Sequence, residues 1–187
     1  MRLFIAFPIV LAPEYDPMLA ELHRQMANDK IVWSKSEVYH LTLRFLGKTP
    51  SVQLPLLREI LKEVATKTPS FNLEISKLGV FGHTYKPETL WLGFQEQPIL
   101  NTMFEMLEKS LVEHGFAPER GHFVPHITLG RIKQVDNKKR FWEAVNNLQP
   151  TYNQLIRLDK VILFRSQLEK EGPIYTPLYQ YSLITDY

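Results

Sequence analysis

Hydrophobic and polar positions alternate along this chain with two different periods, and the order of these periods occurs twice. A period of two is typical of strands and a period near 3.6 of amphipathic helices. The first round predicts a strand at 2–8, a helix at 15–27, a strand at 39–46, a helix beginning near Ser51 and a strand at 71–78. The second predicts a strand at 89–95, a helix at 98–114, a strand at 125–131, a shorter helix, and strands at 154–165 and 175–184.

Each predicted helix has an apolar stripe that would face a core. The stripes are Met18, Leu19, Leu22, Met26; Leu54, Leu57, Leu61, Val64; Leu100, Met103, Phe104, Leu107, Leu111; and Phe141, Trp142, Val145, Leu148. Ser51 is a candidate cap for the second helix, and Gly115 fits the residue just past the third. The segment Glu171-Gly172-Pro173 predicts a hairpin between the last two strands.

The spacing of the two rounds indicates a duplication. His126 follows His40 by 86 positions, and Trp91 follows Phe4 by 87. We therefore expect an α+β fold, a single bilobal domain whose lobes, about 1–80 and 81–187, are related by a pseudo-two-fold axis. Antiparallel sheets would carry helices on their outer faces and enclose a central groove.

Composition narrows the class of protein. With 187 residues, 44% of them hydrophobic, the chain can bury the core of one large domain. A formal net charge of +2, without a long basic block, favours local rather than extended contact with nucleic acid. The absence of cysteine excludes disulfides and thiolate metal sites.

The amino-terminal run needs its own interpretation, because Arg2 followed by the apolar residues 3–13 resembles a short signal peptide. Pro8 interrupts this run, and the repeat uses it as a strand. No segment reaches the roughly 18 apolar residues of a membrane span. We expect a soluble, cytoplasmic protein that acts as a monomer and binds no membrane.

The candidate chemistry lies in two copies of one motif, His40-Leu41-Thr42-Leu43 and His126-Ile127-Thr128-Leu129. Residues i and i+2 of a strand share a face. His40 and Thr42 would therefore point to one side, with Tyr39, Leu41, Leu43 and Phe45 on the packed side. The second motif would divide in the same way and place another histidine and threonine in the groove.

This constellation indicates acid/base chemistry on a phosphate. A histidine titrates near neutral pH, so one imidazole can accept a proton while the other donates one. The threonine hydroxyls can donate hydrogen bonds to phosphoryl oxygens. A lone histidine is more often a core residue and threonine is common in strands, so the repetition carries the inference. Because no serine or cysteine nucleophile, glycine-rich phosphate loop or carboxylate pair accompanies the motifs, we favour direct attack by water.

A metal site is the competing interpretation, since His122 and His126 are four residues apart. Pro125 would break a helix that aligned them, and neither motif contains an acidic residue. We expect no metal and no cofactor. His23, His83 and His114 are interpreted as surface or capping residues.

Two arginines are candidates for binding the phosphate. Strict alternation puts Arg44 on the groove side with His40 and Thr42, but would turn Arg131 toward the core. Gly130 offers a solution, because a glycine can bulge a strand and redirect the next side chain. We therefore expect both Arg44 and Arg131 to bind substrate.

These residues resemble the 2H phosphoesterase superfamily, and within it the bacterial RNA 2′,3′-cyclic phosphodiesterases, historically called 2′-5′ RNA ligases. The resemblance runs nearly end to end. Its segments are Arg2-Leu3-Phe4-Ile5-Ala6, residues 39–47 around the first motif, Leu90-Trp91-Leu92-Gly93, residues 123–131 around the second, Ser166-Gln167-Leu168 and Gly172-Pro173-Ile174-Tyr175.

The resemblance implies hydrolysis of a 2′,3′-cyclic phosphate, on RNA ends or nucleotides, to a 2′-phosphomonoester in a groove between lobes. It implies catalysis by His40, Thr42, His126 and Thr128 and phosphate binding by Arg131. It also implies that aromatic rings hold the base, matching Phe45 and, more weakly, Phe4.

The fifth residue after each histidine is Phe45 in one half and Arg131 in the other. A base stacked near Phe45, with the phosphate held by Arg131, would make His40 the acid and His126 the base. Three alternatives stay open: reversible 2′-5′ RNA ligation, hydrolysis of a small cyclic nucleotide, and a non-catalytic module that binds RNA ends.

Overall fold

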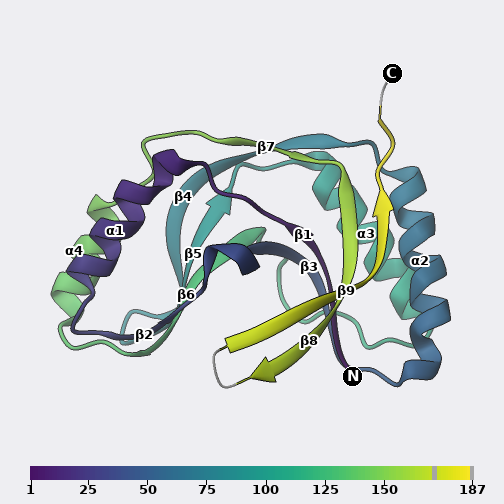
Figure 1. Ribbon diagram of the computed structural model, residues 1–187, viewed down its shortest axis with the longest axis horizontal. Coiled ribbons are helices and arrows are strands. Elements are labelled where there is room, and N and C mark those ends of the chain that lie inside the picture. The colour runs from purple at the N-terminus through teal and green to yellow at the C-terminus, as the bar shows by residue number, and fades with distance from the viewer. Residues whose placement is uncertain (170–171, 186–187) are drawn as a thin grey trace.

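The structure is a computed structural model that describes residues 1–169 and 172–185. It confirms an α+β fold (Figure 1). The strands and α-helices in chain order are β1 Arg2–Pro8, α1 Asp16–Gln25, β2 Lys30–Trp33, β3 His40–Lys48, α2 Leu54–Lys67, β4 Phe71–His83, β5 Lys86–Phe94, α3 Pro98–Glu113, β6 His126–Gln134, α4 Lys138–Asn147, β7 Leu155–Leu158, β8 Lys160–Glu169 and β9 Gly172–Ser182.

Some local predictions were wrong. The short strand β2 was not predicted, and the strand expected at 154–165 divides into β7 and β8. Ser51 begins a short 3-10 helix instead of capping α2. The predicted hairpin is present between β8 and β9, although Glu171 lies outside the described residues.

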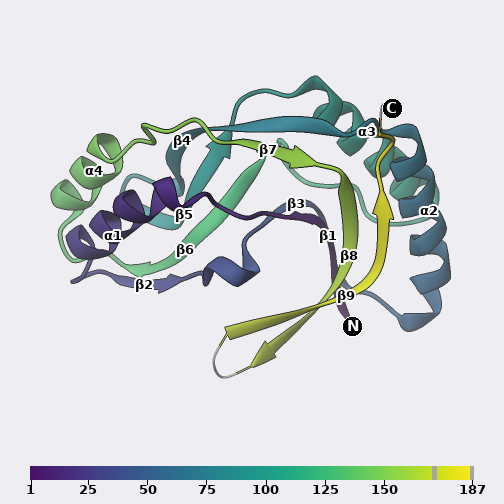
Figure 2. The same ribbon diagram turned by 45° about the horizontal axis from the view of Figure 1, so that its top comes forward.

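The strands form an antiparallel sheet to which both halves of the sequence contribute. The order is β7-β4-β5-β6-β3-β1-β8-β9, and β2 adds to β6. At the centre, the register of β3 and β6 consists of Leu41 opposite Ile127. Because the two motif strands pair so briefly, the sheet divides there into two half-sheets that diverge, as the two ribbon views show (Figure 2).

The two sequence halves exchange elements in space. Helix α1 of the first half packs against α4 of the second, and α2 packs against α3. Strand β4 pairs with β5, while β8 pairs with β1. The lobes are therefore an α1/α4 lobe and an α2/α3 lobe (Figure 1), not residues 1–80 and 81–187. The apolar faces of α1 and α2, from the first half, thus pack against helices of the second half.

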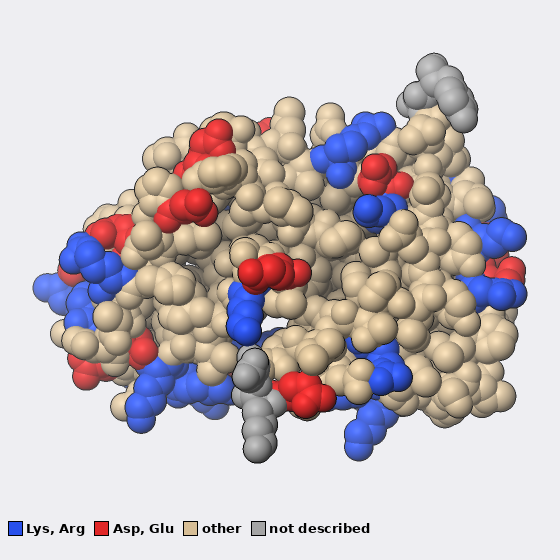
Figure 3. All heavy atoms as spheres, viewed as in Figure 1, with Lys and Arg blue, Asp and Glu red and all other residues tan. Residues whose placement is uncertain are grey.

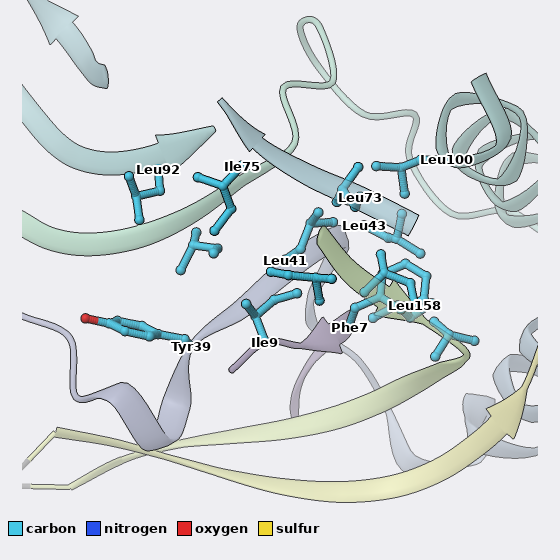
Figure 4. Packing of buried hydrophobic residues seen from close by; sticks show 14 of the residues in the cluster. Phe7, Ile9, Tyr39, Leu41, Leu43, Leu73, Ile75, Leu92, Leu100 and Leu158 are labelled. Atoms are coloured by element: carbon cyan, nitrogen blue, oxygen red, sulfur yellow. The ribbon is translucent and has the colours of Figure 1, made fainter. Parts of the chain in front are cut away.

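The core lies between the sheet and the helices, and the predicted stripes face it. Buried stripe residues are Leu22, Met26, Leu57, Leu61, Val64, Leu100, Met103, Leu107, Leu111, Phe141 and Val145. Met18, Leu19, Leu54, Phe104, Trp142 and Leu148 are partly buried against them. Leu41 and Leu43 of the first motif strand lie in this cluster (Figure 4), so the opposite face of that strand is left for the groove.

The amino-terminal run is the buried strand β1, as the repeat predicted. In the described part of the chain, no helix has the length and apolar character needed to cross a membrane.

Candidate active site

A groove of about 1410 Å³ lies between the half-sheets, and both motifs line it. His40 and Thr42 reach it from β3, and His126 and Thr128 from β6. The space-filling view shows the surface hollowed at the middle of the molecule, with charged side chains of both signs beside the opening (Figure 3). The fold thus brings four polar side chains from distant segments into one groove, in the arrangement that the repeated motif predicted.

Strand pairing explains why the motifs converge. Leu41 and Ile127 are opposite one another and fully buried. In an antiparallel pair the flanking residues also face each other across the strands, so His40 lies on the side of Thr128 and Thr42 on the side of His126. The groove face thus carries two histidine and threonine pairs related by the symmetry of the sheet.

Both imidazoles are held in the same way. The Nδ1 atom of His40 is 2.8 Å from the carbonyl oxygen of Val38, and that of His126 is 2.7 Å from the carbonyl oxygen of Val124. A carbonyl can only accept, so each Nδ1 carries the proton of the neutral ring. The Nε2 atom of each ring is then the basic one and is available for proton transfer.

The electrostatic environment favours the neutral form of both rings. Burial lowers the pKa of His40, and the positive charges of His126 and Arg131 lower it further, against the opposing hydrogen bond to Val38. Burial and Arg131 likewise lower the pKa of His126. Since a proton on His126 disfavours one on His40, the groove suits a pair that carries a single proton.

Aromatic rings surround each histidine. Phe4 and Tyr175 lie 5.0 and 5.1 Å from the His40 ring, centroid to centroid. Phe81 lies 4.8 Å from the His126 ring. These rings limit how far each imidazole can rotate, and they cause the burial that lowers the pKa values.

The predicted bulge at Gly130 is present. Opposite β5, Leu90 pairs with Gly130 but Trp91 pairs with Thr128, so Leu129 is an extra residue in β6. This reverses the alternation and turns Arg131 into the groove. A side chain at Gly130 would collide with β2, because an added Cβ would lie 2.6 Å from Cγ2 of Ile31.

The prediction for Arg44 was wrong, because the same bulge occurs in β3. Ile5 pairs with Arg44 but Ala6 pairs with Thr42, so Leu43 is the extra residue. Arg44 consequently points away from the groove and is buried, whereas Phe45, expected on the packed face by alternation, is 55% exposed and lines the groove. Arg44 is not placed to bind a ligand there.

Arg44 instead joins three segments behind the site. Its Nε is 2.8 Å from Oε2 of Glu108 on α3, and its Nη1 is 2.7 Å from Oε2 of Glu119. Nη1 also donates to the carbonyl oxygen of Phe45, and Nη2 donates to that of Ala117. These contacts tie the first motif strand to the loop that leads to His126.

Phe4 lies deeper than a base-stacking residue should. It is 2% exposed and packs on Phe45 at 5.8 Å and on Phe164 at 5.2 Å. Its position at the groove floor supports His40 and Phe45 rather than offering an open face.

The groove residues to which sequence reasoning gave no role include Trp33, Phe81, Thr89 and Tyr175. Tyr175 belongs to the segment Gly172-Pro173-Ile174-Tyr175, which is part of the family resemblance, so the sequence did contain a reason to consider it. Thr89 faces Arg131 across the strands and Trp33 lies on the unpredicted strand β2. Their roles depend on strand pairing, which no local pattern reveals. Among the described residues, no cluster of three His, Asp or Glu side chains forms a metal site.

Comparisons with known proteins agree with this geometry. A family model described as the 2′-5′ RNA ligase superfamily matches residues 33–168. A Thermotoga maritima protein named RNA 2′,3′-cyclic phosphodiesterase is 33% identical over 148 residues, which cover 79% of this chain and 77% of that protein. A protein of the same name from Methanothermobacter thermautotrophicus is 30% identical over 152 residues, covering 81% and 82%.

Solved structures share the fold. TT0787 from Thermus thermophilus superposes with a TM-score of 0.78 at 24% identity, covering 100% of both chains. LigT from E. coli, solved in complex with 3′-AMP, superposes with a TM-score of 0.77 at 23% identity, covering 97% of both chains. The family match spans most of the chain and both groove-lining motifs, and it shows that this protein belongs to the 2′-5′ RNA ligase superfamily.

Proposed function

We propose that this protein hydrolyses 2′,3′-cyclic phosphates, on RNA ends or nucleotides, to 2′-phosphomonoesters without a metal. The observation that carries the proposal is the pair of imidazoles whose Nδ1 atoms bond to backbone carbonyls and whose Nε2 atoms remain available in one groove. The names of the relatives support the same reaction class.

The position of Phe45 in the groove supports an assignment of which histidine donates a proton and which accepts one. Phe45 is the exposed ring, and Phe4 connects it to His40. A nucleoside stacked on Phe45 would place its ribose beside His40. The oxygen that leaves phosphorus belongs to this ribose, so His40 is the acid that protonates it and His126 is the base on the opposite side.

The reaction then balances as follows. His126 removes a proton from water while the water oxygen bonds to phosphorus. The bond from phosphorus to the 3′-oxygen breaks, and His40 supplies the proton of the new 3′-hydroxyl. The 2′-oxygen keeps its bond to phosphorus, so the product is a 2′-phosphomonoester.

Charge on the phosphoryl oxygens grows during this displacement. Thr42 and Thr128 donate hydroxyl hydrogen bonds to these oxygens from opposite strands, and Arg131 binds them with its guanidinium. Negative charge bound between the rings also raises the pKa of the histidine that must hold the proton.

The test is an assay with a 2′,3′-cyclic nucleotide in the presence of a chelator, with the product isomer identified by phosphorus NMR. We expect a 2′-phosphomonoester. His40→Ala and His126→Ala should each reduce the rate by about 10² to 10⁴. His122→Ala is the matched control and should retain the rate, because this exposed histidine lies outside the groove lining.

Three results would contradict the proposal. A 3′-phosphomonoester would reverse the assignment of the leaving oxygen. Binding without turnover would support an RNA-end binding module instead. Full activity in either histidine variant would remove the two-histidine mechanism.

A further inference from the structure

The groove extends beyond the histidines and Phe45, along strands β1, β8 and β9 of the α2/α3 lobe. Its lining there includes Arg2, Ser166, Leu168 and Pro173, to which the proposed mechanism gives no role. The hairpin of β8 and β9 projects from the body of the protein at this end of the groove (Figures 1 and 2).

Strand register orders these side chains into successive rows on one face. Phe4 pairs with both Phe45 and Phe164, which defines an aromatic row. Arg2 pairs with Ser166, and Ser166 pairs with Tyr175, which defines a second row. The third row, farther along the hairpin, is Leu168 opposite Pro173. Successive rows are two residues apart along a strand, or about 7 Å.

Apolar and positively charged rows alternate along the groove, as bases and phosphates alternate along a nucleic-acid strand. The aromatic row offers the exposed ring of Phe45, the second row offers the guanidinium of Arg2, and the third offers an apolar surface. Leu168 is 70% exposed and lines the groove, so its apolar side chain is open to contact with a ligand there. Lys48 pairs with Arg2 across β1 and β3 but is not part of the groove lining, so Arg2 is the cation of the second row.

The direction of the substrate agrees with this order. In the proposed mechanism the cyclic phosphate is bound at the histidines and the terminal base at Phe45, so the 5′ side of the terminal ribose would point away from the catalytic groups. The next phosphodiester would reach the Arg2 row, and the next base would reach the Leu168 and Pro173 row. Glu169 follows Leu168 and also lines the groove, so we place no further phosphate contact there.

We propose that these rows form a subsite for the penultimate nucleotide, in which Arg2 binds its 3′ phosphodiester and Leu168 with Pro173 contacts its base. The inference rests on the proposed function and deepens it. The preferred substrate is then an RNA strand that ends in a 2′,3′-cyclic phosphate, not a cyclic mononucleotide.

The test compares kcat/KM for a 2′,3′-cyclic mononucleotide and for a dinucleotide that ends in the same nucleoside cyclic phosphate. We expect the dinucleotide to be favoured about tenfold or more, given the usual strength of one base contact and one phosphate contact. Arg2→Ala and Leu168→Ser should each lower this ratio about fivefold or more.

Each variant has a matched control. Arg165→Ala removes the same charge from β8, but Arg165 pairs with Leu3 and lies on the other face. Leu155→Ser removes a leucine that is 63% exposed on β7, outside the groove lining. Neither control should change the ratio of the two kcat/KM values.

The dependence on salt gives an independent readout. For the dinucleotide, Arg2→Ala should make the slope of log kcat/KM against log salt concentration shallower by up to about 0.7.

The outcomes separate the two proposals. Equal kcat/KM for both substrates in the unmodified protein would overturn the subsite and leave the proposed hydrolysis intact. A preference for the dinucleotide that both groove variants retain would overturn the placement of the subsite on these rows. Failure to hydrolyse either substrate would overturn the proposed function and the subsite with it.

Discussion

Arg44 and Gly130 occupy equivalent positions, four residues after the histidine of each motif, yet their surroundings are opposite. Arg44 extends into the interior and contacts Glu108 and Glu119, while Gly130 leaves room for Ile31 of β2. Both follow the same bulge, so the next residue turns into the groove in each half. The near-symmetric scaffold thereby presents an aromatic ring on one side and a guanidinium on the other.

Removing the Arg44 side chain should destabilise the protein. Breaking a buried ion pair costs about 3–5 kcal/mol, but the side chains of Glu108 and Glu119 are 18% and 38% exposed. We therefore expect Arg44→Met to lower the free energy of unfolding by about 2 kcal/mol. Urea unfolding measures this. As a control, Arg58→Met loses only an exposed pair with Glu59 and should change the free energy of unfolding by less than about 0.5 kcal/mol. If both variants lower the free energy of unfolding equally, the buried ion pairs of Arg44 do not stabilise the protein more than an exposed pair does.

A side chain at Gly130 should disturb the bulge that orients Arg131. Gly130→Ala places a methyl group against Ile31 and, at 3.2 Å, against the Trp33 ring. We expect a loss of about 1–3 kcal/mol in stability and a higher KM, because β6 must shift. Adding Ile31→Ala removes the closest atom, so the double variant should be less impaired than the sum of the single variants. Strict additivity would contradict the steric explanation.

The threonine hydroxyls can be tested without changing side-chain shape. Thr42→Val and Thr128→Val should each lower kcat by about 10² to 10³, the usual effect of removing one donor to a developing negative charge. Serine at either position retains a hydroxyl and should restore most of the activity. Valine variants with normal kcat would exclude the donor role and leave strand formation as the reason for threonine.

The dependence of the rate on pH follows from the lowered pKa values. In the proposed mechanism His126 must be neutral to accept a proton, so kcat/KM should fall when the pH falls through its pKa. Burial and Arg131 lower this pKa, which places the midpoint of the acid limb below the ordinary histidine value of about 6.5. Arg131→Gln removes one cause of the lowered pKa. The pKa values of the histidines, measured by NMR titration, should therefore rise. A shift to lower pH would contradict the electrostatic explanation.

Stacking on Phe45 can be separated from phosphate binding. Phe45→Ala should raise KM for a cyclic nucleotide about tenfold, since stacking on an aromatic ring contributes about 1–3 kcal/mol per base. A ribose cyclic phosphate without a base should show no such change. If both substrates are weakened equally, the base does not stack on this ring.

Several features of the fold were predictable because they depend on neighbours in sequence. The stripe of α3, from Leu100 to Leu111, has the helical period and is buried as expected. His40 and Thr42 share a face because two residues of a strand always do. The bulge at Gly130 was also predictable, since only a bulge brings Arg131 to the same groove as its motif.

No comparable feature of the sequence indicated the equivalent bulge at Leu43. Arg44 fits an exposed face in any local pattern, and its partners Glu108 and Glu119 lie 64 and 75 positions away. The exchange of α1 and α3 between the two lobes was hidden for the same reason. An apolar stripe shows that a helix is covered without showing what covers it.

The sequence by itself determined the reactive groups and their local spacing: two imidazoles, each with a hydroxyl two residues later on the same strand face. The tertiary structure decided which strands lie side by side, where the bulges reverse the alternation, and thus that Phe45 and Arg131, not Arg44, enter the groove. Side-chain alternation is a property of one strand, whereas pairing and bulges arise from contacts between strands that are distant in sequence.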